Sequence, residues 1–173
     1  EHYAAAPAVF DRLIAECLQS DKSKANTLMA LRFMANGFAR PATAAAVQQH
    51  VVVLAEVLPA MLTMDNTNVR VTAAALMSNI SSKLARGASS PDALRVLAQC
   101  MTTAMEVLHR ATETSDEVLY RTLVVLGTIV MLNASIAKLA KEMHARETVE
   151  ALVAKLTTER TQACAALLLA HAL

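Results

Sequence analysis

The sequence predicts an all-α protein, an armadillo- or HEAT-like right-handed helical solenoid of about four repeats. Composition is the first observation behind this prediction. Hydrophobic residues make up 55% of the chain and aromatic residues only 3%, and Ala, Leu, Val and Met dominate. These residues favour helices, whereas β-sandwiches are richer in aromatic and turn residues. No segment alternates between polar and apolar residues as a strand would.

A recurring helical segment is the second observation. Asn36, Asn79 and Gly127 end similar apolar runs, and they lie 43 and then 48 residues apart. Armadillo and HEAT repeats have a period of roughly 40–47 residues. Such proteins bind partners along an extended concave surface. The clearest copies are residues 26–38, 68–80 and 117–129, and a weaker copy closes the chain at residues 159–173.

Turn and cap residues divide the first half of the chain into helices. Residues 3–18 form the first helix, and a polar loop follows it. Asn26 is expected to cap the helix of residues 27–38, and Pro41 breaks the chain after it. Thr43 then caps a helix that runs to about residue 58, where Pro59 kinks it or separates a short further helix. The polar residues 65–68 form a turn or cap.

The second half is divided in the same way. A helix of residues 69–84 ends near Gly87. Ser89 to Asp92 include a helix cap, with Pro91 in the first turn of the helix that runs to residue 110. Ser115 caps the helix of residues 118–132, and Asn133 begins another that runs to about residue 146. Residues 147–156 and 161–172 complete the set.

Charge and cysteine content limit the possible functions. The net charge is +1, and no basic stripe suggests a nucleic-acid partner. The three cysteines are far apart in helical patterns, which indicates free thiols in a reducing compartment, cytoplasmic or nuclear. We find no run of 18 apolar residues, no metal-ligand spacing, no phosphate-binding loop and no catalytic constellation. We therefore expect a monomeric binding module rather than an enzyme, without metal or cofactor and without a membrane partner.

The last helix of each repeat is expected to line the concave face, so its polar residues are the candidates for binding. Arg32 lies in an otherwise apolar turn, and Asn36 shares its face. The two could grip an extended peptide, the amide on its backbone and the guanidinium on a carboxylate. The alternative is that Arg32 pairs with an acid elsewhere in the fold, because a buried unpaired charge is costly.

Three further candidates come from the later copies. Asn79 stands where Asn36 stands, and Lys83 follows it on the same face. Alternatively, each Asn bonds a neighbouring helix or an internal turn. Arg121 is the odd charge in the third copy, and an ion pair with Glu117 is its structural alternative. If Gly127 aligns with Asn36, then Arg121 does not align with Arg32, and the two arginines project differently.

Segments of the chain resemble the PUL domain, which ends the phospholipase-activating protein of animals and its fungal counterparts. The family carries a segment like residues 25–38, an "ALN"-like segment resembling residues 76–79, then "R-x-LVALGTL", close to residues 121–129, and a "LAK" resembling residues 139–141. The similarity runs in order over most of residues 20–173. It implies an armadillo-like domain acting in ubiquitin pathways.

The resemblance also implies a partner, the acidic C-terminal tail of the hexameric AAA ATPase valosin-containing protein, with its penultimate Tyr. The family binds this tail in a basic concave groove in which arginines take part. By motif match these arginines correspond to Arg32 and Arg121, with Asn36 and Asn79 as neighbours. Ubiquitin would be reached only through other domains.

Two departures from the family pattern shape the expectations. A "WP"-type segment is missing before the first motif, so we expect residues 1–173 to form the later part of one PUL domain from a longer protein. The low net charge requires any positive pocket to be local. Two alternatives remain: a helical accessory domain of a papain-like deubiquitinating or deSUMOylating isopeptidase, and a generic armadillo scaffold for another acidic peptide.

Overall fold

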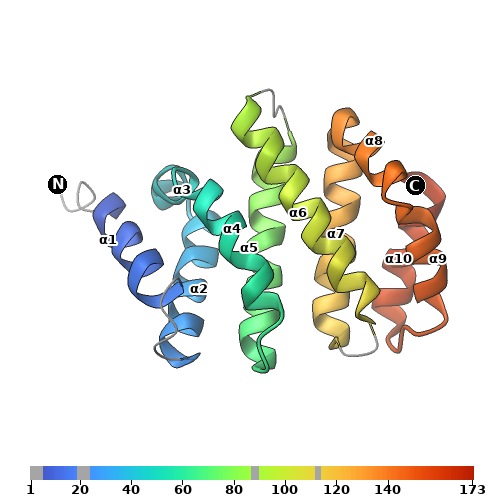
Figure 1. The fold of residues 1–173 in the computed structure, drawn as a ribbon, viewed down its shortest axis with the longest axis horizontal. Helices are drawn as coiled ribbons and strands as arrows, with labels where there is room; N and C mark the ends of the chain where they lie inside the picture. The colour runs from blue at the N-terminus through green and yellow to red at the C-terminus, as the bar shows by residue number, and fades with distance from the viewer. Residues whose placement is uncertain (1–5, 19–23, 87–89, 112–113) are drawn as a thin grey trace. The chain divides into compact units, whose positions relative to one another are not determined.

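A computed structural model describes residues 6–18, 24–86, 90–111 and 114–173, and all regular structure in these ranges is helical (Figure 1). The all-α prediction is therefore confirmed. The chain divides into two compact units, Glu1–Ile80 and Ser81–Leu173. In both units, helices pack on elements that are close in sequence, as expected for a solenoid-type repeat.

The first unit begins with α1 (Ala6–Leu13), which continues into a short π-helix, η1 (Ile14–Leu18). It also contains α2 (Lys24–Ala39), α3 (Pro41–Gln48), α4 (Val51–Leu62) and most of α5 (Thr67–Ala85). α2 packs on η1 and α3, and α1 packs on α3. The largest fully buried side chains of this unit are Phe10, Leu31, Met34, Leu54, Leu58, Leu76, Met77 and Ile80.

Two boundaries in the first unit differ from the predictions. α2 begins at Lys24, so Asn26 lies inside the helix and does not cap it. The predicted helix from Thr43 to about residue 58 is two helices, α3 and α4, because the chain turns at Gln49 and His50. The Thr43 hydroxyl does not cap a helix; it donates a 2.8 Å hydrogen bond to the carbonyl of Gly37. α4 runs through Pro59.

The second unit contains α6 (Pro91–His109), α7 (Asp116–Leu132), α8 (Ala134–Glu142), α9 (Ala145–Val153) and α10 (Glu159–His171). α6 packs on α7, α8 and α9, and α10 packs on α7 and α9. Buried methionines fill this core as well, with Met101 and Met105 fully enclosed.

In the second unit the predicted cap before α6 and the predicted helix start at Asn133 are both confirmed. The side chain of Ser90 accepts a 3.2 Å hydrogen bond from the Ala93 N–H, with Pro91 as the first helical residue. The side chain of Asn133 caps α8 in the same way, by accepting a 3.2 Å hydrogen bond from the Ile136 N–H. Ser115 precedes α7, but its side chain makes no capping hydrogen bond. The predicted helix from Asn133 to residue 146 is broken at His144, whose φ of 54° is left-handed. The predicted stop at Gly87 lies outside the described residues.

The four sequence copies fall on α2, α5, α7 and α10. The surroundings of the three aligned positions differ, however. Asn36 is exposed, Asn79 is half-buried and bonds α2, and Gly127 faces Leu168 of α10. Similar helices are thus repeated without identical contacts.

Within the described ranges, no single helix is both long and apolar enough to cross a membrane. α3 and α4 meet the criteria of length and composition only as a pair, and the pair is bent by 84°.

Candidate peptide-binding site

The solvent-exposed face of α2 carries two of the predicted residues, Arg32 and Asn36. Their neighbours Leu31 and Met34 point into the core and are completely buried. Asn36 is four positions after Arg32, so their side chains lie on one face of the helix. Among the described residues neither side chain has a hydrogen-bond or ion-pair partner. The alternative for Arg32, pairing with an acid, is therefore not found among these residues.

Asn36 borders a hollow of about 190 Å³ at the contact of α1, α2 and α3. The ring of Phe10 is buried, whereas the ring of Phe33 is 49% exposed, and their centroids are 5.4 Å apart. Arg40, directly after α2, adds a guanidinium that has no partner in the described part of the chain. The six lining residues are Phe10, Phe33, Asn36, Gly37, Arg40 and Thr43.

The close contact of α2 with α3 depends on Gly37. A Cβ atom at this position would lie 2.6 Å from Cγ2 of Val47 and 3.8 Å from the ring of Phe10. Real Cβ atoms do not approach a carbon that closely, so only glycine fits without a shift of the neighbouring side chain. Because Gly37 has no side chain, α3 can pack close to α2 at the edge of the hollow.

Asn79 bonds a neighbouring helix, which was the alternative to a direct role in peptide binding. Its side-chain amide donates a 3.0 Å hydrogen bond to the carbonyl oxygen of Ala35, across from α5 to α2. One of its donors is therefore occupied within the fold. Lys83, one turn further on, is exposed and has no partner among the described residues.

Arg121 forms an ion pair with Glu117, which was the alternative to peptide binding. Its Nε lies 2.7 Å from a carboxylate oxygen of Glu117, without the angle of a hydrogen bond. The other oxygen of Glu117 pairs with Arg160 at the start of α10. The guanidinium of Arg160 stacks 3.8 Å above the ring of Tyr120. One carboxylate thus serves two guanidiniums, which leaves this trio with a formal charge of +1.

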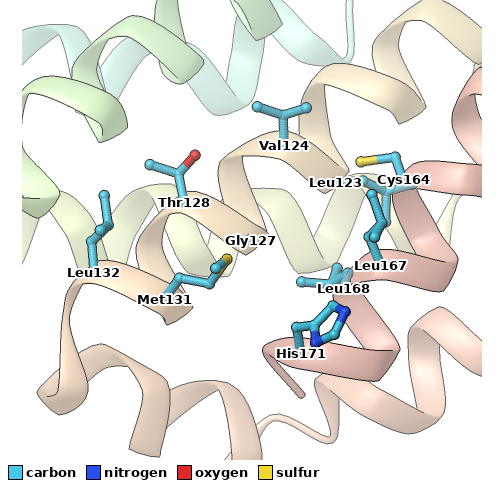
Figure 2. Close-up of a pocket in the computed structure, with 10 residues that line it drawn as sticks. All are labelled: Leu123, Val124, Gly127, Thr128, Met131, Leu132, Cys164, Leu167, Leu168 and His171. Atoms are coloured by element: carbon cyan, nitrogen blue, oxygen red, sulfur yellow. The ribbon is translucent and has the colours of Figure 1, made fainter.

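An apolar groove of about 450 Å³ lies between α7 and α10 in the second unit. Figure 2 shows the side chains of α7 on one side and those of α10 on the other. Met131 and Leu167 are 66% and 62% exposed at its edge. No Asp, Glu, Lys or Arg lines the groove, so it offers no direct partner to an acidic residue. The lining residues are Leu123, Val124, Gly127, Thr128, Met131, Leu132, Cys164, Leu167, Leu168 and His171.

Two of the three thiols, those of Cys100 and Cys164, do not resemble nucleophiles. Cys100 is buried, and this burial raises the pKa of its thiol to about 12, although the nearby hydroxyl of Ser81 acts in the opposite direction. Burial also raises the pKa of Cys164, against the nearby charge of Arg160. Both groups are therefore protonated near neutral pH. Within the described ranges, no group of three His, Cys, Asp or Glu side chains could hold a metal ion.

Sequence reasoning missed Arg40, Phe33 and Arg160. Arg40 stands beside Pro41, and the pair was interpreted only as a chain break. Phe33 follows Arg32 in an apolar run and drew no separate prediction, although half of it is exposed. Arg160 occurs in the fourth, weakest copy. The hydrophobic pattern could have placed Phe33 on the face of Asn36, because the two are three residues apart.

Comparison with known proteins gives one family. The model of the PUL domain matches residues 2–167, and no curated protein or solved structure matches the chain significantly. The match extends over almost all of both units. The PUL domain is a protein-interaction module rather than a catalytic one. With its helical repeats and a family match over nearly its whole length, this chain belongs to the PUL domain family.

Proposed function

We propose that this PUL domain binds the acidic C-terminal tail of a hexameric AAA ATPase, valosin-containing protein, as an adaptor in ubiquitin-dependent protein handling. The exposed face of α2 is the observation that carries the proposal, because Arg32 and Arg40 stand on either side of Asn36 without partners among the described residues. Unpaired guanidiniums and a side-chain amide are what an extended acidic peptide requires.

The charge distribution supports an acidic partner over a basic or neutral one. The chain as a whole is nearly neutral, with 16 basic and 15 acidic residues, so attraction depends on local arrangement. The hollow beside α2 contains Arg40 and no carboxylate. An acidic tail would gain two charge-assisted contacts here without first displacing an internal acid.

Arg121 has a different part in the proposal, because Glu117 already neutralises part of its charge. A tail carboxylate reaching Arg121 must compete with Glu117 or share the two guanidiniums of Arg121 and Arg160 with it. Asn79 would support the peptide face indirectly, by holding α2 through Ala35. Lys83, exposed on α5, is a further candidate contact for an acidic residue of the tail.

The proposed role requires neither cofactor nor metal and suits a monomer in the cytoplasm or nucleus. Ubiquitin would be bound by other domains of the protein.

Calorimetric titration tests the proposal. The tail peptide of the ATPase is titrated into the domain, beside a copy that ends before the Tyr and a copy with its acidic residues changed to amides. We expect binding of the intact tail alone, weakening as salt is added. Arg32→Ala should weaken it, whereas Arg110→Ala, which removes the same charge from an exposed position after α6, should not.

Equal binding of the intact and shortened tails would contradict the proposal and indicate a generic scaffold for acidic peptides. A domain that binds no tail peptide would favour the accessory role in an isopeptidase.

A further inference from the structure

We infer that the apolar groove between α7 and α10 binds an uncharged small molecule with an unbranched alkyl chain. The groove lies in the second unit, whereas the proposed peptide face is on α2 in the first unit, so this inference goes beyond the proposed function. Figure 2 shows the side chains of both helices around the groove. Its exposure, shape and charge together define the ligand.

Exposed apolar side chains gather at this groove. Among the described residues seven large hydrophobic side chains are exposed, and three of them, Met131, Leu132 and Leu167, line the groove. Apolar surface that is gathered in one place, rather than scattered singly, marks a binding site or an interface. Covering it removes apolar area from water, which favours an apolar guest.

The groove has the size of a small-molecule site and is elongated. Its volume of about 450 Å³ lies within the roughly 300–1,000 Å³ of such pockets. α7 and α10 run side by side in the same direction, since Asp116 accepts a hydrogen bond from Thr161 at their starts and Gly127 faces Leu168 further along. On α7 the lining runs from Leu123 to Leu132, roughly 13 Å at a rise of 1.5 Å per residue. An extended alkyl chain can contact both helices over this length, whereas a compact ring system would contact only part of it.

The charges around the groove favour an uncharged guest. No Asp, Glu, Lys or Arg of the described ranges lines it. Burial raises the pKa of Cys164, so this thiol is uncharged near neutral pH. At the starts of the two helices, the guanidiniums of Arg121 and Arg160 are already paired with Glu117. A charged group that moved from water into the groove would therefore lose its hydration without gaining an unpaired ion of opposite sign.

A peptide backbone fits this lining less well than an alkyl chain. An extended peptide would place backbone N–H and C=O groups against a lining whose polar side chains are those of Thr128, Cys164 and His171. An alkyl chain has no such groups to satisfy. Its uncharged polar end can lie beside the exposed imidazole of His171, at the end of the groove.

Displacement of a neutral fluorescent dye tests the site. N-phenylnaphthylamine is bound to the domain and displaced with octanol, decanol and dodecanol at about pH 8, where an imidazole is ordinarily uncharged. Each step of two CH₂ groups should tighten binding roughly 5- to 15-fold until the chain fills the groove. Decanoate and decylammonium should each displace the dye roughly tenfold less well than decanol, because their charges find no partner there.

Two glutamate variants locate the binding. Leu167→Glu places a carboxylate at the edge of the groove, where Leu167 is 62% exposed. Met29→Glu makes the same kind of change at a 64% exposed position on α2, outside the groove. Circular dichroism and thermal unfolding check that both variants fold. Leu167→Glu should weaken decanol binding roughly tenfold or more, and Met29→Glu should leave it unchanged.

Several results would overturn the inference. These are a domain that binds neither dye nor alcohols, affinities that do not depend on chain length, and equal losses in the two variants. Displacement of the dye by the ATPase tail peptide would assign the groove to the peptide. Binding to phosphatidylcholine vesicles that Leu167→Glu abolishes would assign it to a membrane surface. A dimer in analytical ultracentrifugation that Leu167→Glu dissociates would make it an interface between two copies. The proposed function is tested separately, by Arg32→Ala and the tail peptide.

Discussion

The side-chain amide of Asn79 donates a 3.0 Å hydrogen bond to the carbonyl oxygen of Ala35 and thereby joins α5 to α2. Ala35 precedes Asn36 on the helix whose solvent-exposed face carries Arg32. The position that the sequence repeat aligns with Asn36 is therefore a support for α2, whereas Asn36 itself is exposed and has no partner in the part of the chain that the structure describes.

The two asparagines give a matched pair of variants. Asn79→Ala removes the hydrogen bond to Ala35 and should lower the free energy of unfolding by about 0.5–1.5 kcal/mol relative to Asn36→Ala. Both changes replace Asn by Ala inside a helix, so the gain in helix propensity cancels in the comparison. Asn36→Ala should instead reduce tail affinity. Chemical denaturation of both variants measures the difference, and equal stabilities would contradict the supporting role of Asn79.

The two helical glycines should respond in opposite directions to alanine. Gly37→Ala forces a Cβ atom against Cγ2 of Val47, now 2.6 Å from its position, and overpacking of this kind costs about 1–3 kcal/mol. A Cβ atom on Gly127 would lie 3.4 Å from Leu168, an ordinary contact, so Gly127→Ala should stabilise the domain by up to about 1 kcal/mol. Thermal unfolding measures both changes. If Gly37→Ala were the more stable of the two variants, this result would contradict the close packing of α2 on α3 at Gly37.

Glu117 limits the charge that Arg121 and Arg160 offer to a partner. Glu117→Gln keeps the shape of the side chain and removes its charge, with a stability cost below about 1 kcal/mol because the ion pairs are partly exposed. If Arg121 contributes to tail binding, this variant should bind the tail severalfold more tightly and lose more affinity as salt is added. Unchanged affinity, together with unchanged binding by Arg121→Ala, would limit the role of Arg121 to its ion pair.

The Asp116 carboxyl group should make the free energy of unfolding of the second unit depend on pH. Burial raises the pKa of its carboxyl group, but hydrogen bonds from Thr158, Thr161 and Thr157 outweigh this and lower the pKa below its ordinary value of 3.8. The Thr161 hydroxyl donates at 2.6 Å, which ties the start of α10 to the start of α7. A carboxyl group with a lowered pKa stabilises the fold above its unfolded pKa, and this contribution disappears as pH falls through the folded value.

Unfolding of wild type and Asp116→Asn between about pH 6 and pH 2 measures this contribution. The stability advantage of wild type should be constant above about pH 5 and should shrink below pH 4. An advantage that stays the same down to pH 2 would contradict the assignment.

Local signals in the sequence were enough to predict much of the fold. Ser90 with Pro91, and Asn133, act through neighbours three residues away, so their roles can be recognised without knowing the fold. The division of α3 from α4 was missed because Gln49 and His50 are not turn-forming residues. The ring of His50 lies 5.9 Å from that of Phe10, so the turn is packed against another helix.

The candidate site was less predictable because its geometry depends on distant residues. The partner of Asn79 is 44 positions earlier in the chain. Arg160 meets Glu117 only because α10 packs on α7. Periodicity identified the polar residues in the repeated helices, but it could not tell which were already paired. It also gave no sign of the hollow, whose lining residues come from α1, α2 and α3.

Mapping of amide chemical shifts in an isotope-labelled sample tests the central claim most directly, and at 18.5 kDa the domain is small enough for this measurement. Addition of the ATPase tail peptide should shift the signals of Arg32, Asn36 and Arg40 and leave those on the outer face of α6 unchanged. A peptide with its acidic residues changed to amides should produce no such shifts. Shifts that avoid α2, or that appear equally with the amide peptide, would contradict docking of an acidic tail on this helix.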